Sequence, residues 1–163
     1  SDPNATTANF PSGGTAQQFG YSLSLCGVGC NGLAVNYGTA CAGTAGLPIN
    51  TSYGLPTIPN SGFSLRLLNG PPSVPVVNFF GLTRVSLDLS FLQMPGCFLL
   101  SLPDIASFST RTGSTGEARI RIPIPGDPLL AGGRFYSQWV ILDRGANPLG
   151  VITSDGLEIT LCF

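Results

Sequence analysis

Residues 134–143 read Arg-Phe-Tyr-Ser-Gln-Trp-Val-Ile-Leu-Asp and form the longest stretch with the residue pattern of a β-strand. Successive side chains of an extended chain point to opposite faces. One face then carries Phe135, Ser137, Trp139 and Ile141, and the other carries Tyr136, Gln138, Val140 and Leu142. Trp139 lies in the middle of this segment and is predicted to be a core residue rather than a sugar-stacking one.

Similar patterns recur along the chain on both sides of this segment. Strands are predicted over residues 17–26, 63–67, 74–80, 85–91, 97–102, 105–112, 118–124 and 157–163. No window of ten residues has the pattern of an amphipathic helix. About eight or nine short strands separated by turns predict an all-β fold, either a sandwich or a barrel, and we favour a jelly-roll-like β-sandwich.

Several local features are predicted between these strands. The turn at residues 113–116 is expected to join 105–112 and 118–124 into a hairpin, and residues 127–130 to form one helical turn. Asn147-Pro148 and Asp155-Gly156 predict turns. Residues 38–60 are expected to be loops with at most short strands. In the last strand, residues 157–163, alternation places Phe163 inward and Cys162 outward.

The N-terminal part differs in composition from the rest. Residues 1–16 are polar and predict a flexible tail, and residues 17–36 predict an extra strand followed by a Gly-rich corner. Residues 37–163 are then the β-sandwich domain. Phe19, Tyr21, Leu23 and Leu25 share one face of the extra strand.

The charge content is low and narrows the functions that the chain can have. Only 9% of the 163 residues are charged, against ~25% in typical proteins, and the net charge is -1. The chain has no Lys and no His, which excludes His-based triads, Ser–Lys and Schiff-base sites and a P-loop. The seven Arg residues are scattered in sequence, which argues against a nucleic-acid partner.

Two interpretations of this charge-poor composition stay open. The chain is either an extracellular domain solubilised by Ser, Thr, Asn and glycans, or a subunit that buries much of its surface against copies of itself. The chain starts at Ser1 and contains no apolar stretch of membrane-spanning length. We therefore expect a mature, secreted protein at the cell surface or outside the cell, with its export signal removed.

The acidic residues suggest no catalytic or metal site. A calcium site at Asp143 with Asn147, or at Asp155 with Glu158, competes with turn capping, which we prefer. A glycosidase pair would have to come from Asp88, Asp104, Glu117, Asp127 and Glu158, and nothing in the sequence brings two of them together. We expect no enzyme activity, cofactor or metal. Tyr53 and Tyr136 are candidates for stacking on sugars, and Asn4 and Asn50 fit the glycosylation pattern N-x-S/T.

The chain from Tyr37 onward resembles a domain found at the C-termini of many secreted bacterial proteins, often with no assigned activity. The resemblance rests on an ordered series of short motifs. These are residues 37–46 (YGTACAGTAG), 64–72 (SLRLLNGPP), 95–97 (PGC), 122–128 (IPIPGDP), 135–143 (FYSQWVILD), 145–150 (GANPLG) and 154–160 (SDGLEIT). The resemblance implies a secreted β-sandwich with a Cys41–Cys97 disulfide and brings no catalytic residues. Residues 1–36 and the terminal Cys162 lie outside that pattern.

These additional features suggest self-assembly. An exposed sheet edge without Lys is adhesive, and residues 17–26 would span ~33 Å when extended. We expect this strand to pair with the next molecule, which gives a head-to-tail filament of copies of this chain. Cys162 is hypothesised to bridge Cys26 or Cys30 of a neighbour. The alternatives are a local Cys26–Cys30 loop with Cys162 free, or an intrachain bridge to Cys162. The alternative function is a secreted module that binds carbohydrate or another cell-surface ligand.

Overall fold

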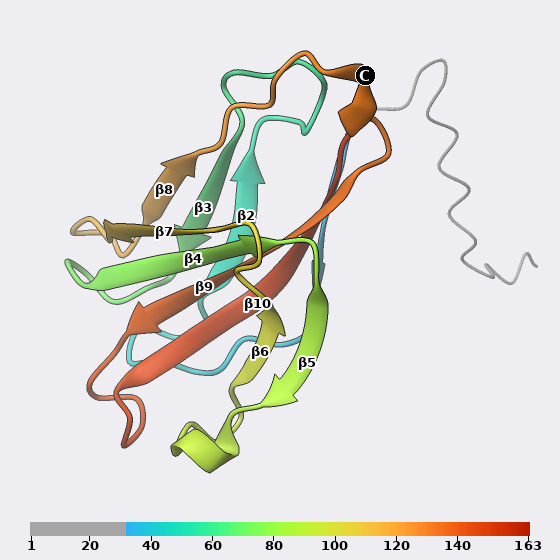
Figure 1. The fold of residues 1–163 in the computed structure, drawn as a ribbon. Coiled ribbons are helices and arrows are strands. Elements are labelled where there is room, and N and C mark those ends of the chain that lie inside the picture. Colours follow the sequence, from blue (N-terminus) through green and yellow to red (C-terminus); the bar gives the residue numbers. More distant parts are fainter. Residues whose placement is uncertain (1–31) are drawn as a thin grey trace, which may run out of the picture.

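A five-stranded antiparallel sheet forms the framework of the fold (Figure 1). The computed structural model describes residues 32–163. The strand order of the sheet is β1-β10-β9-β4-β7. Its strands are β1 (Leu33–Tyr37), β10 (Val151–Thr160), β9 (Arg134–Leu142), β4 (Pro75–Gly81) and β7 (Ala106–Arg111).

A three-stranded sheet covers one face of this framework, and a hairpin covers part of the other. The smaller sheet has the order β2-β3-β8, with β2 (Ile49–Tyr53), β3 (Ser64–Leu68) and β8 (Ala118–Arg121). The hairpin consists of β5 (Arg84–Asp88) and β6 (Phe98–Ser101), with a short 3-10 turn, η1 (Ser90–Leu92), between them. A second such turn, η2 (Pro128–Leu130), precedes β9. The predicted all-β sandwich is therefore confirmed, with ten strands in the described residues.

The core between the two sheets follows the predicted alternation. Phe63, Leu65 and Leu67 are buried on the inner face of the small sheet. Trp139 and Ile141 are buried on the facing side of β9, so Trp139 is a core residue as expected. The predicted helical turn at residues 127–130 is also present, and the Asp127 carboxylate caps it by accepting from the Leu129 amide.

A buried polar network crosses this core. The Asn50 side-chain amide donates to the Ser137 carbonyl at 2.8 Å, and its Oδ1 accepts from Trp139 Nε1 at 3.1 Å. Asn78 Nδ2 donates to Ser137 Oγ at 2.9 Å. Asn50 is fully buried, so a glycan on its amide would break these bonds and displace the core. The prediction of a glycan at Asn50 is therefore wrong for the folded domain.

Hydrogen bonds attach the hairpin to the opposite face of β9, and a disulfide joins it to the loop that follows β1. Gln138 Oε1 accepts from the Leu100 amide and Nε2 donates to the Phe98 carbonyl, both at 2.8 Å. Cys41 and Cys97 are bonded with an S–S distance of 2.05 Å, which confirms the pairing implied by the family resemblance. Because both faces of β9 are covered, its Gln138 is as buried as its Trp139.

The predicted hairpin at residues 105–124 is wrong. β7 pairs with β4 in the large sheet, whereas β8 pairs with β3 in the small sheet. The turn between them passes from one sheet to the other, and the Gly116 carbonyl accepts from the Gly70 amide at 3.0 Å. Alternation is the same in strands of either sheet, so it did not reveal this change of sheet.

The predicted turn at Asp155-Gly156 is also wrong, because both residues lie inside β10. The pairing of β10 with β9 shifts register between Thr153 and Gly156, as in a β-bulge. A Cβ on Gly156 would lie 2.3 Å from Cζ of Tyr37, so glycine allows the Tyr37 ring to pack on the strand. Because β10 continues through Asp155 and Gly156, it has ten residues and is longer than β9, which has nine.

The two ends of the described chain also depart from expectation. The predicted boundary between residues 36 and 37 falls inside β1, which pairs with β10 along its whole length. Cys162, predicted to face outward, is buried, and Phe163, predicted to face inward, is exposed. The strand ends at Thr160, so the alternation does not extend to these two residues.

Candidate assembly surface

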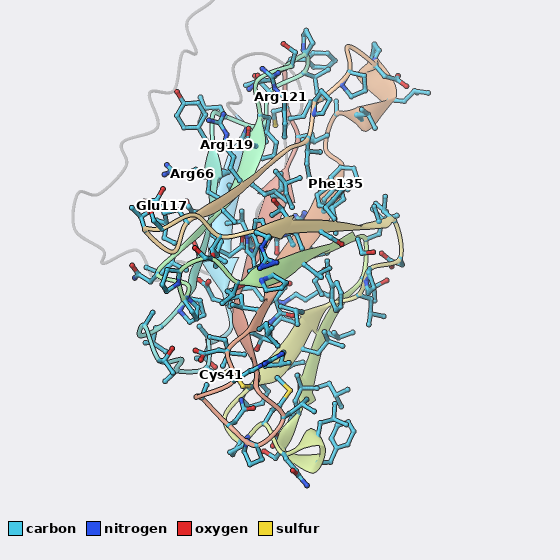
Figure 2. All side chains as sticks on the ribbon, turned by 90° about the vertical axis from the view of Figure 1, so that its left-hand side faces the viewer. Cys41, Arg66, Glu117, Arg119, Arg121 and Phe135 are labelled. Carbon is cyan, nitrogen blue, oxygen red and sulfur yellow. A yellow bond between two sulfur atoms is a disulfide. The ribbon has the colours of Figure 1, made fainter. Side chains whose placement is uncertain are left out.

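One hollow of the fold is an apolar groove with a volume of about 150 Å³. We define the groove by the side chains of Phe63, Phe80, Ile122, Ile124, Leu130 and Phe135, with Pro123, Pro125, Ile159 and Leu161 completing its wall. They come from β4, β9 and the end of β10 in the large sheet, from Phe63 directly before β3, and from the segment that runs from the end of β8 into η2. Figure 2 shows Phe135 on the side where this segment passes above β7.

The groove follows from the way in which the chain leaves β8. Pro123 and Pro125 have no amide hydrogen, so they cannot continue a regular ladder. The Ile122 amide still bonds to the Phe63 carbonyl at 3.0 Å, and Asn60 pairs with Ile124. This fixes Ile122 and Ile124 against the core, where Ile124 is buried and Ile122 is half-buried.

The floor of the groove is aromatic. The Phe80 and Phe135 rings are stacked with centroids 5.4 Å apart, and Phe108 packs beside Phe80 at 6.5 Å. The volume is about 150 Å³. A dry cavity of this size in a protein accommodates about one aromatic ring. The groove can therefore bind one large apolar side chain but offers no polar group for chemistry.

A second adhesive feature is the edge strand β1. Within the described residues it pairs only with β10, and Leu33 and Val35 are 59% and 49% exposed. Beside them, Glu158 lies 3.6 Å from Arg84 and 3.9 Å from Arg134. The Arg84 guanidinium stacks 4.1 Å over the Tyr37 ring, and burial raises the pKa of the Tyr37 hydroxyl. This cluster holds β1 against the sheet and leaves its outer side open.

Large apolar side chains are exposed elsewhere as well. They are spread over loops and both short helical turns, and include Leu55, Leu82, Phe91, Leu129, Leu149 and Phe163. By contrast, the described residues form three salt bridges, at Glu117 and Glu158. A surface with this balance favours burial against another molecule.

Each carboxylate that could belong to a glycosidase pair has a hydrogen-bond or salt-bridge partner within the protein. Asp88 accepts from Ser90, Asp104 from Leu82 and Thr83, and Asp127 from Leu129. Glu117 pairs with Arg66, and Glu158 pairs with Arg84 and Arg134.

Of the residues considered for calcium sites, Asn147 caps a local turn, whereas the Asp143 and Asp155 carboxylates bind backbone amides that are distant in the sequence. Asp143 accepts from the Thr44 amide at 2.7 Å, and Asn147 accepts from the Gly150 amide at 2.8 Å. Asp155 accepts from the Asn50 amide at 2.7 Å. In residues 32–163, no three acids or cysteines gather in a way that would hold a metal ion.

The predicted assembly residues lie mostly outside the described part of the chain. Phe19, Tyr21, Leu23 and Leu25, together with Cys26, Cys30 and the glycosylation candidate Asn4, fall in residues 1–31, which the structure does not describe. Cys162 is buried and disulfide-bonded, so the alternative in which it is a free thiol is wrong.

No protein-family model, curated protein or solved structure matches this chain. In residues 32–163, none of the helices has the length and apolar character needed to cross a membrane. The groove was not predicted from the sequence. Its one sequence signal was the repeat Ile122-Pro123-Ile124-Pro125, in which apolar residues alternate with residues that cannot pair.

Proposed function

We propose that this protein is a secreted subunit of an extracellular, self-assembling filament. The N-terminal strand of one subunit, residues 17–26, docks on the sandwich of the next. The observation that carries the proposal is the apolar groove, which is lined by apolar side chains of the large sheet and of the segments that flank β3 and β8.

The N-terminal strand has the composition that such a groove requires. In the strand predicted for residues 17–26, alternation would put Phe19, Tyr21, Leu23 and Leu25 on one face, and the groove volume of about 150 Å³ fits one aromatic ring. Burial of one large apolar side chain stabilises a contact by about 1.5–3 kcal/mol. Because the docking strand and the groove are different parts of the chain, the contact is heterologous and propagates into a filament.

Secretion is supported by the Cys41–Cys97 disulfide, which is buried and joins the loop after β1 to the residue that precedes β6. Disulfides of this structural kind persist in oxidising compartments. The low charge content also suits a subunit whose surface is largely buried in an assembly.

The groove can be tested with two neighbouring leucines of η2. Leu130 lines the groove, whereas Leu129 is 91% exposed and is not part of the groove wall. We expect Leu130→Ser to shorten or abolish filaments in negative-stain microscopy and to lower light scattering. The matched control Leu129→Ser should assemble like the parent protein. Filaments of equal length for both variants would contradict the docking site, and dispersed parent protein would contradict the filament.

A further inference from the structure

The outer face of the small sheet gathers arginines that are far apart in the sequence. Arg66 on β3 and Arg119 on β8 are directly opposite each other in the register, and Arg121 follows on the same side of β8. Figure 2 shows Glu117, Arg66, Arg119 and Arg121 along one side of the molecule. The sequence-based view that the arginines are scattered is therefore incorrect for this face.

The arginines border an open hollow of about 500 Å³, lined by Tyr53, Arg66, Thr110, Arg111, Glu117 and Arg119. Like charges directly opposite each other in a sheet are destabilising. Here Arg66 pairs with Glu117 at 3.0 Å, and the Arg119 guanidinium stacks 4.4 Å from the Tyr53 ring centroid. The lining of the hollow thus contains three arginines, Arg66, Arg111 and Arg119, and one carboxylate, Glu117. Its net charge is therefore positive.

We propose that this hollow binds an acidic polysaccharide through its carboxylate groups. Guanidinium groups bind carboxylates with two parallel hydrogen bonds, and Arg66 and Arg119, which both line the hollow, are direct neighbours across β3 and β8. The Tyr53 ring is 55% exposed beside them and offers a surface for a sugar ring. The Thr110 hydroxyl at the rim adds a polar group for sugar hydroxyls.

An acidic polysaccharide fits this face better than a nucleic acid does. Nucleic-acid sites combine a clearly basic domain with many cations along the phosphate backbone. This chain has a net charge of -1 and no Lys, and Glu117 stands inside the hollow, where it would repel a dense row of phosphates. This hollow and the apolar groove share no lining residue, and the hollow is lined mainly by polar and charged side chains. The inference therefore does not depend on filament assembly.

The test is isothermal titration of the full-length protein with short galacturonate oligosaccharides, with neutral maltooligosaccharides as the matched control. We expect saturable binding of the acidic sugar alone, weakened by added salt. Arg119→Gln should weaken binding about tenfold. Glu117→Gln should tighten it roughly threefold, because a like charge is removed from the site. Arg134→Gln, which alters the Glu158 cluster on the other sheet, should have no effect.

Opposite signs for Arg119→Gln and Glu117→Gln separate a binding role from a general loss of stability. The proposal is overturned by absence of binding, by equal binding of the neutral sugar, or by an Arg119→Gln variant that binds as well as the parent. Tighter binding of a single-stranded oligonucleotide than of the acidic sugar would also overturn it.

Discussion

Trp139 Nε1 donates a hydrogen bond of 3.1 Å to Asn50 Oδ1, and this bond joins the centres of the two sheets. Both residues are fully buried. The Asn50 side-chain amide also donates a hydrogen bond to the Ser137 carbonyl, and the Ser137 hydroxyl accepts one from Asn78 Nδ2. A polar network with all its members satisfied fixes the relative position of two sheets more specifically than apolar packing alone.

Replacement of Asn50 should test the value of this network. Asn50→Leu leaves Trp139 Nε1 and the Ser137 carbonyl without their partner in the core, so we expect a loss of about 3 kcal/mol in the free energy of unfolding. Urea denaturation monitored by far-UV circular dichroism measures it, because that signal is also present in variants that lack Trp139. In the double variant with Trp139→Phe the two losses should be less than additive. Additive losses would mean that the two side chains act independently.

The Cys41–Cys97 disulfide should contribute strongly to stability. It closes a loop with a sequence separation of 56 residues, which corresponds to about 4 kcal/mol of loop-closure entropy in the unfolded chain. The double variant Cys41→Ala, Cys97→Ala should therefore unfold at a clearly lower urea concentration. It leaves Cys162 unchanged, so the effect belongs to this bond. An unchanged midpoint would contradict the prediction.

Asp155 should make the domain less stable as the pH rises. Burial raises the pKa of its carboxyl above the ordinary value of 3.8, although hydrogen bonds from Asn50 and Asn36 act in the opposite direction. The folded state then binds more protons than the unfolded state between 3.8 and the raised pKa, so stability falls as the pH rises through that range. Relative to Asp155→Asn, the parent protein should lose stability in urea melts from acid to neutral pH.

Asp104 should affect the pH dependence of stability in the opposite direction and therefore serves as a control. Hydrogen bonds from Thr83 and Leu82 lower the pKa of its carboxyl below 3.8. The folded state therefore binds fewer protons, and this contribution to stability is lost as the pH falls through the lowered pKa. Relative to Asp104→Asn, the parent should gain stability as the pH rises. The same pH trend for both aspartates would refute the two assignments.

Gly156 should be required for the edge strand β1. Its Cβ position lies 2.3 Å from Tyr37 Cζ, and the Tyr37 ring cannot easily move because its hydroxyl donates to the Leu100 carbonyl at 2.8 Å. We expect Gly156→Ala to cost about 1–3 kcal/mol and to accelerate hydrogen exchange of the β1 amides. The double variant with Tyr37→Ala should cost less than the two single changes together, since it removes the clash. Slow exchange in Gly156→Ala would contradict this account.

The sequence was sufficient to predict the parts of the fold that depend on period-two alternation. Phe63, Leu65 and Leu67 are buried because every second residue of β3 faces one core. The helical turn at residues 127–130 was predicted because Asp127-Pro128 is a strong local start signal.

Features that depend on which strands become neighbours were not predictable in this way. β7 and β8 have ordinary strand patterns, and only their partners β4 and β3 reveal that they belong to different sheets. The arginine face has the same origin, because Arg66 and Arg119 are brought together by pairing across 53 positions of the chain. The groove is lined by residues of β4, β9, β10 and the segment after β8, which strand alternation alone does not bring together.

The most direct test of strand docking is a photo-crosslinking experiment on mixed subunits. A benzophenone side chain placed at position 130 lies in the groove, and equal amounts of isotope-labelled and unlabelled full-length protein are assembled together before illumination. Docking predicts crosslinks from position 130 to residues 17–26, with labelled and unlabelled peptides joined in mass spectra. Crosslinks that join only peptides of the same isotope, or none to residues 17–26, would contradict the account.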